Sequence, residues 1–447
     1  MIRALAVASL LAVLAAPAWA QDAGAGAAAS SEARSLARQS DPVTVRGRDM
    51  PPLVGKKIAA LGAFAIREGR WTPIPYQIDE KIDADNYVFP AGKENNGRSA
   101  TGLLKKVDEV VFMARDAGDR SDLAGAPAGA GTGVEVTLTD PVTGAKGWAY
   151  VFEFAGEFPK SGVDYVAYEP ERERITAETY EIQYTPGLDH IFFSQLSVPE
   201  AAGGSGAEFC DRLKLRTYIK TRLFVSLSFD EEEWESNVKQ YLDGPVRVIR
   251  QVENRLSFLG IDVAPTIQVD ATYYRDLHVA PAIINQTLNL PAIAREAWFK
   301  ASIDFSEKAE GMKYYRPSPG VKDPYHAING RTESDEEALD PRAPPWHLVT
   351  GAPGTLLWWL ELPKPLVPVT DLYYVDERTT SDPPEATPGA IGEIGFKFDL
   401  FPLAKGKYFM RLFYGFPSRW KPGDEKRMIE VIEKPLKYVT GPALKAG

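Results

Sequence analysis

The most constraining feature of the sequence is a run of strict alternation between apolar and polar residues from position 212 to position 229. One set of alternate positions is apolar apart from two threonines, and the other begins with cations. The first set is Leu213, Leu215, Thr217, Ile219, Thr221, Leu223, Val225, Leu227 and Phe229. Successive side chains of a strand point to opposite faces, and an ordinary strand has about 5–6 residues. The run therefore predicts an unusually long strand with one buried and one solvated face.

Three later segments alternate in the same way, at 246–256, 267–278 and 297–305. Four such segments in succession predict a meander inside a broad sandwich. The expected fold class is all-β with an antiparallel β-sandwich architecture and little helix. Residues 231–242 are the best candidate for a short helix, and 426–439 fits either a short helix or an edge strand.

Shorter strand signals elsewhere predict two sandwiches in one chain. We expect a smaller N-terminal β-sandwich at 42–165 and a larger antiparallel sandwich at 166–447. Within the second, 306–345 is rich in Pro and Gly and ends near an acidic run, so it is predicted to be a long loop. Loops of that length are uncommon and are either functional or disordered.

The first 20 residues predict export. A single cation, Arg3, precedes an apolar run, and Ala18-Trp19-Ala20 matches the small-residue pattern of a cleavage site. Residues 1–20 are therefore expected to be a signal peptide, 21–41 a flexible leader, and the mature protein periplasmic or secreted. No later stretch reaches 18 uncharged apolar residues, so no membrane span is expected after cleavage.

Charge and cysteine content exclude other classes. The chain has 51 Lys and Arg against 61 Asp and Glu, a formal net charge of −10, which argues against nucleic-acid binding. Its one cysteine, Cys210, cannot form a disulfide within the chain, and no Cys/His cluster has zinc spacing. No cofactor is expected. Asp79, Asp83 and Asp85 leave structural calcium open, with solvated turn acids as the favoured alternative.

The polar face of the long strand carries a row of cations, which we call the basic row. Its members are Arg212, Lys214, Arg216, Lys220 and Arg222, with Tyr218 among them. Same-face residues lie about 6.6–7 Å apart. We favour a lattice in which neighbouring strands neutralise the row, with acids such as Glu178, Glu253, Asp270, Asp276 and Asp304. The alternative is a groove for an anionic ligand, in which arginines grip carboxylates or phosphates and Tyr218, Tyr274 and Trp298 stack.

Catalytic signatures are missing from the sequence. It has no G-x-S-x-G elbow, H-E-x-x-H pair, Walker A loop or dinucleotide-binding glycine pattern. If the basic face is catalytic, the chemistry that suits it is proton abstraction beside a carboxylate, as in uronate β-elimination. Tyr274 or His278 would then act as base or acid.

A short pattern in the N-terminal half resembles known modules. Q-x-D-E at Gln77–Glu80 and D-E-V-V-F-M-A-R-D-x-G at Asp108–Gly118 are similar to amino-terminal β-sandwich modules of secreted bacterial carbohydrate-active proteins. The resemblance covers about residues 71–120. It implies a sandwich fold and a saccharide context, and it brings no catalytic residue with it.

These observations predict an exported ligand-binding or accessory protein, with carbohydrate as the preferred ligand class. Besides a glycan, an anionic ligand or an envelope protein is expected as a possible binding partner. The alternative function is a carbohydrate-active enzyme, specifically a lyase on acidic polysaccharide that uses the polar face of the 212–305 sheet.

Overall fold

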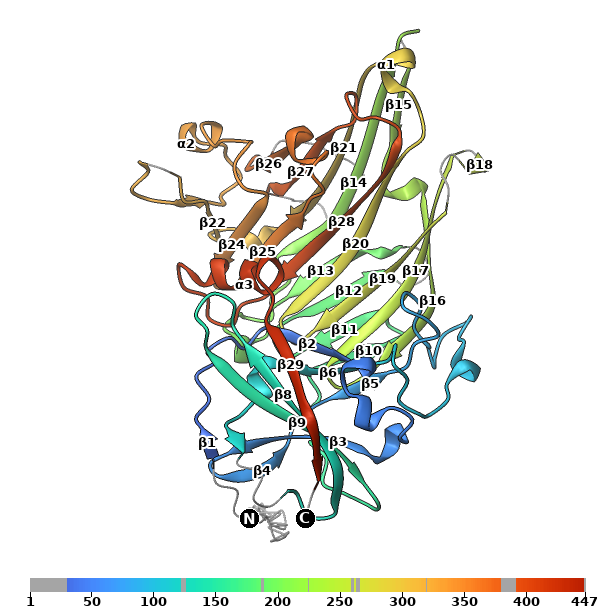
Figure 1. Ribbon diagram of the computed structural model, residues 1–447. Coiled ribbons are helices and arrows are strands. Elements are labelled where there is room, and N and C mark those ends of the chain that lie inside the picture. Colours follow the sequence, from blue (N-terminus) through green and yellow to red (C-terminus); the bar gives the residue numbers. More distant parts are fainter. Residues whose placement is uncertain are drawn as a thin grey trace, which may run out of the picture.

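The computed structural model describes residues 30–121, 126–185, 189–223, 225–258, 261–262, 266–318, 320–378 and 391–445. The predicted signal peptide, 1–20, and residues 21–29 of the predicted leader lie outside them. The described chain is mostly antiparallel strand, arranged as a large sandwich above a smaller N-terminal region (Figure 1). None of the described helices is long and apolar enough to cross a membrane.

One layer of the large sandwich is a nine-stranded sheet of described residues. Its order is β10-β11-β12-β13-β14-β21-β27-β26, with β15 paired to β14. The strands are Val166–Glu169 (β10), Arg174–Ala177 (β11), Glu181–Thr185 (β12), Asp189–Ser197 (β13), Cys210–Thr221 (β14), Ser226–Phe229 (β15), Ala294–Phe305 (β21), Thr370–Val375 (β26) and Glu393–Asp399 (β27).

The other layer is a ten-stranded sheet of described residues. Its order is β16-β17-β19-β20-β28-β25-β24-β22-β23, with β18 paired to β17. The strands are Trp234–Asp243 (β16), Arg247–Phe258 (β17), Ile261–Asp262 (β18), Ile267–Tyr274 (β19), Leu277–Gln286 (β20), Lys313–Tyr315 (β22), Tyr325–Ala327 (β23), Trp346–Gly351 (β24), Gly354–Glu361 (β25) and Gly406–Gly415 (β28).

The core of the large sandwich lies between these two sheets. Ile303 and Phe396 contribute from the nine-stranded sheet, and Trp358 and Tyr414 contribute from the ten-stranded sheet. The rings of Trp358 and Phe396 meet edge to face at 4.8 Å. Side chains from both inner faces therefore fill one apolar layer, as the all-β sandwich prediction requires.

The N-terminal region consists of three smaller sheets, with orders β2-β6-β5, β29-β8-β9-β3-β4 and β1-β7. Their strands are Ser30–Glu32 (β1), Pro42–Arg46 (β2), Leu61–Arg67 (β3), Arg70–Pro73 (β4), Gln77–Asp79 (β5), Glu109–Met113 (β6), Arg120–Ser121 (β7), Ala130–Thr139 (β8), Lys146–Phe154 (β9) and Lys437–Lys445 (β29). The division at 165/166 stays a prediction. The C-terminal strand β29, expected in the large sandwich, pairs with β8 and completes an N-terminal sheet.

The predicted four-strand meander is wrong. β14 pairs with β21, whereas β17 and β19 pair with each other in the opposite sheet. The run at 212–229 is also not one strand, because β15 folds back on β14 with Thr217 opposite Phe229. Alternation gives the face of each residue but contains no information on which distant strand becomes its neighbour.

Three further segments differ from their predictions. Residues 231–242, expected as a helix, form a single 3₁₀ turn at Glu231–Glu233 followed by strand β16. The segment 426–439 contains both alternatives, since helix α3 (Asp424–Glu433) precedes β29. The predicted loop 306–345 holds β22, β23 and the short helix α2 (Ser334–Glu337), and its two strands extend the ten-stranded sheet.

The described part of the predicted leader is ordered structure. Leu36 is 4% exposed and belongs to the N-terminal core. The guanidinium of Arg34 donates to the carbonyls of Arg115 and Ala117 at 2.9 and 2.8 Å. A small-residue, polar composition predicts flexibility, whereas in the fold the buried Leu36 and the hydrogen-bonded Arg34 attach the segment to the N-terminal region.

Candidate functional site

The N-terminal region and the large sandwich meet at a buried polar seam around Arg247, the first residue of β17. Its Nε and Nη2 lie 2.8 and 2.6 Å from Oδ2 of Asp79 in β5. Its Nη2 also lies 2.7 Å from Oε2 of Glu109 in β6. The side-chain oxygen of Gln77 accepts hydrogen bonds from the backbone N–H groups of Val246 and Arg247 at 2.9 and 2.8 Å. The seam therefore fixes the start of β17 against β5 and β6.

The short pattern that resembles carbohydrate-active modules belongs to this seam. Lys81 Nζ lies 3.2 Å from Oε1 of Glu109, and the hydroxyl of Tyr87 donates to its Oε2 at 2.9 Å. Asp108 accepts from the backbone N–H of Lys81 at 2.8 Å. Gln77, Asp79 and Glu109 of the pattern thus join the two regions, whereas Asp108 bonds within the N-terminal region.

Beside Arg247 the seam opens into a cleft of about 490 Å³, which we call the seam cleft. One wall is the outer face of β19, β20 and β28, and the other comes from β2, α3 and the segment that follows α3. Its principal lining residues are Asp41, Tyr87, Arg247, Asp270, Thr272, Tyr274, Val279, Pro281, Arg411, Ile432, Pro435, Leu436 and Tyr438. Small-molecule sites occupy about 300–1,000 Å³, so the cleft has the size of a ligand site.

Polar groups of both signs reach this cleft. Asp270 is half-buried and accepts from Nε2 of Gln251 at 2.9 Å, and burial raises the pKa of its carboxyl. Burial also raises the pKa of Asp41, to about 6, although Arg38 bonds to it. Arg411 presents a half-exposed guanidinium whose Nε lies 2.5 Å from Oε2 of Glu361. The cleft therefore combines two carboxyls that resist ionisation with a cation at its edge.

Tyr274 lies in the seam cleft, but His278 does not. On β19 the residues Asp270, Thr272 and Tyr274 face the cleft, as the alternation predicted. The prediction then continued the same strand to 278, whereas the chain turns at 275–276 and β20 begins at Leu277. Because His278 pairs with Tyr273 across this hairpin, its side chain points into the sandwich core.

The environment of His278 is that of a core residue. Its ring stacks on Tyr273 at 4.2 Å and on Tyr414 at 5.1 Å, and it is 3% exposed. Its Nδ1 lies 3.1 Å from the carbonyl oxygen of Thr272. Burial lowers the pKa of His278 to about 3, so the imidazole is neutral inside the protein. A catalytic base for a polymer needs access to substrate, and this ring has none.

The inner half of the basic row is neutralised. Glu231, which is fully buried, pairs with Arg216 and lies 3.3 Å from Nη1 of Arg212. Lys214 Nζ lies 3.0 Å from Oδ2 of Asp304 on the adjacent strand β21. The favoured lattice is present here, with Asp304 among the acids expected for it and Glu231 as an acid we did not expect.

The outer half of the basic row faces solvent more. Tyr218 stacks on Trp298 at 5.4 Å, and Lys397 lies 4.8 Å above the indole. Lys220 is half-buried, and Arg222 is exposed and donates to the carbonyl of Pro291 at 2.8 Å. The ligand-binding role of the row stays a prediction, but its convergence with Tyr274 and His278 does not occur, because those residues lie in the ten-stranded sheet.

The residues of the calcium hypothesis are kept apart by other contacts. Asp79 is 2% exposed and pairs with Arg247, whereas Asp83 and Asp85 are exposed. Asp83 accepts from Nδ2 of Asn86 at 2.9 Å. Among the described residues, no group of three or more His, Cys, Asp or Glu side chains is placed to hold a metal ion.

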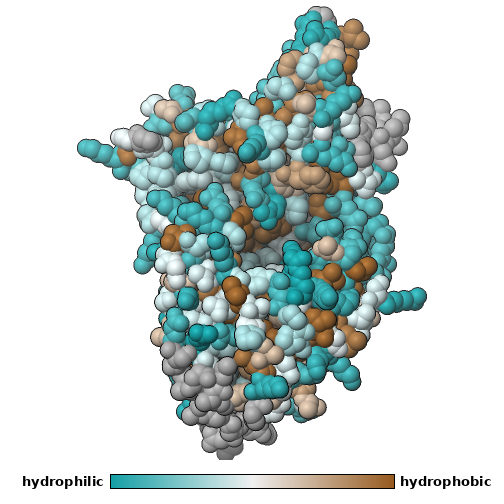
Figure 2. All heavy atoms as spheres, viewed as in Figure 1, coloured by the Kyte–Doolittle hydropathy of each residue, from teal (hydrophilic) through white to brown (hydrophobic). Residues whose placement is uncertain are grey.

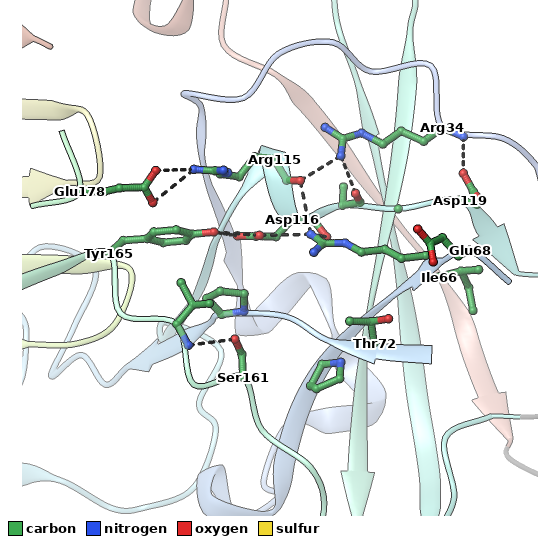
Figure 3. Close-up of a pocket in the computed structure, with 16 residues that line it drawn as sticks. Arg34, Ile66, Glu68, Thr72, Arg115, Asp116, Asp119, Ser161, Tyr165 and Glu178 are labelled. Atoms are coloured by element: carbon green, nitrogen blue, oxygen red, sulfur yellow. Dashed lines mark hydrogen bonds and ion pairs between the residues drawn. The ribbon is translucent and has the colours of Figure 1, made fainter. Parts of the chain in front are cut away.

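A second cleft of about 660 Å³ lies at another part of the seam (Figure 3). Arg115 Nη1 lies 3.1 Å from Oε1 of Glu178, and Arg67 Nη2 lies 3.2 Å from Oδ1 of Asp116. The hydroxyl of Tyr165 donates to the same carboxylate at 2.9 Å. Figure 3 shows Arg115 pointing toward Glu178 and Tyr165 pointing toward Asp116, so these contacts join the two sides of the cleft.

Sequence reasoning missed Arg247, Arg411 and Asp41. Arg247 begins a strand and gives no local signal, and Asp41 was placed at the end of a flexible leader. A cleft whose walls come from residues 41–87, 247–281 and 411–438 brings together side chains far apart in the chain. The signal that was available is the polar face of β19, which gave Tyr274 as a candidate and placed Asp270 on the same face, where it was expected only as an acid that neutralises the basic row.

The fold was compared with known proteins. No family model and no curated protein matches the chain. An α-mannosidase from Enterococcus faecalis V583 aligns with a TM-score of 0.45 at 8% identity, over 93% of this chain and 46% of that one. A protein in the glycosyl hydrolase family 38 from Enterococcus faecalis aligns with a TM-score of 0.43 at 9% identity, over 93% of this chain and 47% of that one. The chain thus spans about half the length of these structures, and a likeness this distant carries no argument about activity.

Proposed function

We propose that the protein is an exported glycan-binding protein and that the seam cleft is its binding site. The observation that carries the proposal is the composition of the cleft. Asp270 on the polar face of β19, the tyrosines Tyr87 and Tyr438, and Arg411 all line it.

This combination suits the chemistry of a sugar ring. A pyranose has apolar C–H faces that pack on aromatic and aliphatic side chains, and a rim of hydroxyls that need acceptors and donors. Val279, Pro281 and Leu436 supply the apolar surface. The Asp270 carboxyl accepts from hydroxyls, and the Arg411 guanidinium donates to hydroxyls or to a uronate carboxylate. An acidic or neutral oligosaccharide is therefore the ligand class that fits.

The proposal is tested by calorimetry with the mature protein and a panel of neutral and acidic oligosaccharides. Asp270→Asn and Arg411→Gln should each lower the affinity of the glycan that binds by about tenfold, since each changes one polar contact with the sugar hydroxyls. Arg255→Gln is the matched control, because Arg255 also forms an exposed pair, with Glu235, on the same sheet away from the cleft. Absence of binding across the panel, or equal losses in all three variants, contradicts the proposal.

Export is the second part of the proposal, supported by the Ala18-Trp19-Ala20 pattern after an apolar run. Sequencing of the amino terminus of the protein recovered from the periplasmic fraction should give Gln21 as the first residue. Recovery with Met1 at the terminus from the cytoplasmic fraction contradicts it.

A second candidate function uses the same cleft. Nη1 of Arg247 donates to the Tyr274 hydroxyl at 3.4 Å, so a phenol oxygen that lines the cleft lies beside a fixed cation, an arrangement that suits proton abstraction next to a uronate carboxylate. Incubation with acidic polysaccharides and measurement of unsaturated-product absorbance tests it. Tyr274→Phe should abolish that signal in a protein that still binds the polysaccharide, and a signal that survives this substitution excludes Tyr274 as the base.

A further inference from the structure

One end of the large sandwich projects from the body as an arm. Figure 1 shows β14, β15, β21, β20 and β28 extending together to this end, where the short helix α1 (Leu290–Ile293) lies beside β15. The turn after β14 is tied to α1, because the backbone N–H of Arg222 donates to the carbonyl of Ile293 at 2.9 Å. The guanidinium of Arg222 donates to the carbonyl of Pro291 as well. The turn after β14 and α1 therefore form one continuous tip.

Large apolar side chains are exposed at this end, and we call them the apolar tip. They are Leu223 at 85%, Val225 at 54%, Leu288 at 49%, Ile293 at 46% and Phe409 at 64% exposed. Phe409 lies opposite Ile283 on β20, three ladder positions or about 10 Å below the pair of Gly406 and Gln286. Figure 2 shows brown, apolar residues at the projecting end, with hydrophilic residues around them.

Four residues of the apolar tip lie on two neighbouring segments, Leu223 and Val225 in the turn after β14 and Leu288 and Ile293 at α1, which hydrogen bonds join. Other exposed large apolar residues, such as Ile82, Val142, Val321 and Val367, lie singly on different loops and turns. Single exposed apolar residues are normal on any protein, whereas a contiguous group with a polar rim indicates an interaction site.

The charge around the apolar tip is opposite to that of the whole chain. Within residues 218–223, 286–296 and 404–409 there are five cations and one acid, a local balance of 5 − 1 = +4. The cations are Lys220, Arg222, Arg295, Lys405 and Lys407, and the acid is Glu296. The chain as a whole has a formal net charge of −10. Such a charge asymmetry orients the molecule with this end toward an anionic surface.

We propose that the arm docks on an anionic lipid bilayer, with the apolar tip inserted among the lipid headgroups and acyl chains. Apolar side chains surrounded by Lys and Arg match the two layers of such a surface, since the tip meets the acyl region while the cations meet the phosphates. A projecting tip also suits a deformable surface, because it inserts without requiring a complementary cavity. Arg222 and Lys407 are exposed beside Leu223 and Phe409, so the apolar and cationic groups reach the bilayer together.

Vesicle flotation with the mature full-length protein tests the proposal. The vesicles contain phosphatidylethanolamine and phosphatidylglycerol in equal parts, with pure phosphatidylcholine vesicles as the neutral comparison. Binding to the anionic vesicles should exceed binding to the neutral ones and should fall as salt is raised. The double variant Leu223→Ser with Phe409→Ser should lower the affinity for anionic vesicles at least about tenfold, because two inserted side chains are lost.

Matched variants separate docking from general effects. Ile82→Ser with Val321→Ser makes the same kind of change at two exposed positions away from the arm, and it should leave vesicle binding unchanged. Lys405→Gln with Lys407→Gln, at two exposed positions, should weaken binding to anionic vesicles and reduce its salt dependence. Because all these side chains are exposed, the thermal unfolding temperature should be the same in every variant. A lower unfolding temperature would reveal a folding defect in that variant.

Three outcomes overturn the proposal. The first is no binding of the unaltered protein to anionic vesicles at low salt. The second is an equal loss of binding in the tip variant and the control variant. The third is conversion of an oligomer to a monomer by the tip variant, which assigns the apolar tip to a second copy of this chain.

Discussion

Nη2 of Arg247 lies 2.6 Å from Oδ2 of Asp79, and both side chains are at most 4% exposed. This ion pair joins β17 of the large sandwich to β5 of the N-terminal region. Glu109 lies on the same guanidinium, so two carboxylates share one cation in a buried seam. Contacts of this kind cost much desolvation and are weak promoters of stability, but removal of one partner leaves a buried charge without compensation.

Arg247→Met should lower the free energy of unfolding by about 3–5 kcal/mol, because Asp79 and Glu109 lose their shared cation in a buried site. Urea unfolding followed by tryptophan fluorescence measures this loss. Arg255→Met removes the partner of Glu235 in a pair that is 45% and 51% exposed, so it should cost no more than about 1 kcal/mol. A similar loss in the free energy of unfolding for the two variants contradicts a structural role of the seam.

Acid should destabilise the protein through its buried histidines. Burial lowers the pKa of His278 and of His347 to about 3, below the value of about 6.5 for an exposed imidazole. Below about pH 6.5 the unfolded chain takes up protons that the folded chain does not, so stability is complete above that pH and falls on acidification toward pH 3. The expected loss is about 1.4 kcal/mol per pH unit for each histidine.

The variant His278→Phe tests that pH dependence. It keeps an aromatic ring between Tyr273 and Tyr414 and removes the titrating group. Its stability should fall less steeply between about pH 6 and pH 4 than that of the unaltered protein, by about 1.4 kcal/mol per pH unit. An unchanged slope shows that His278 takes up its proton in the folded state.

The basic row should act on stability more than on ligand affinity. Glu231→Gln removes the fully buried carboxylate that pairs with Arg212 and Arg216, and it should lower the free energy of unfolding by about 3 kcal/mol. Glycan affinity measured by calorimetry should stay within twofold of the original. A large loss of affinity with unchanged stability assigns the row to ligand binding instead.

The C-terminal strand should be needed for the N-terminal region. Truncation after Pro435 removes β29 and uncovers the edge of β8, together with the contact of Tyr438 to Asp49 at 2.6 Å. We expect a loss of at least about 3 kcal/mol, a rise in aggregation, and faster amide exchange in β8. Truncation after Lys445 is the control, and it should behave like the full chain.

The alternation predicted some of these features well. It assigned the β19 residues Asp270 and Tyr274 to the outer face and Ala271 and Tyr273 to the core, as found. It failed at 275–276, where Arg275-Asp276 makes a hairpin turn without glycine or proline. A two-residue turn reverses the chain, so every face assigned beyond it on the assumption of one strand is wrong, as His278 shows.

The site was predicted less well than the fold. The face on which Tyr274 and Asp270 lie could be predicted because both belong to a regular strand. Asp41, Arg247 and Arg411 reach the same cleft from segments hundreds of residues apart, and no local pattern relates them. The basic row was visible, but Glu231 approaches it from a turn that follows the hairpin of β14 and β15.

The sequence by itself determined the period of each strand, the side chains that are apolar on one face, and hence the all-β sandwich. These properties follow from local backbone geometry, in which successive side chains alternate. Tertiary structure alone decided that β14 lies beside β21, that β29 returns to β8, and that Arg247 meets Asp79. Strand pairing and buried ion pairs depend on long-range packing of the whole chain, which no local pattern of residues contains.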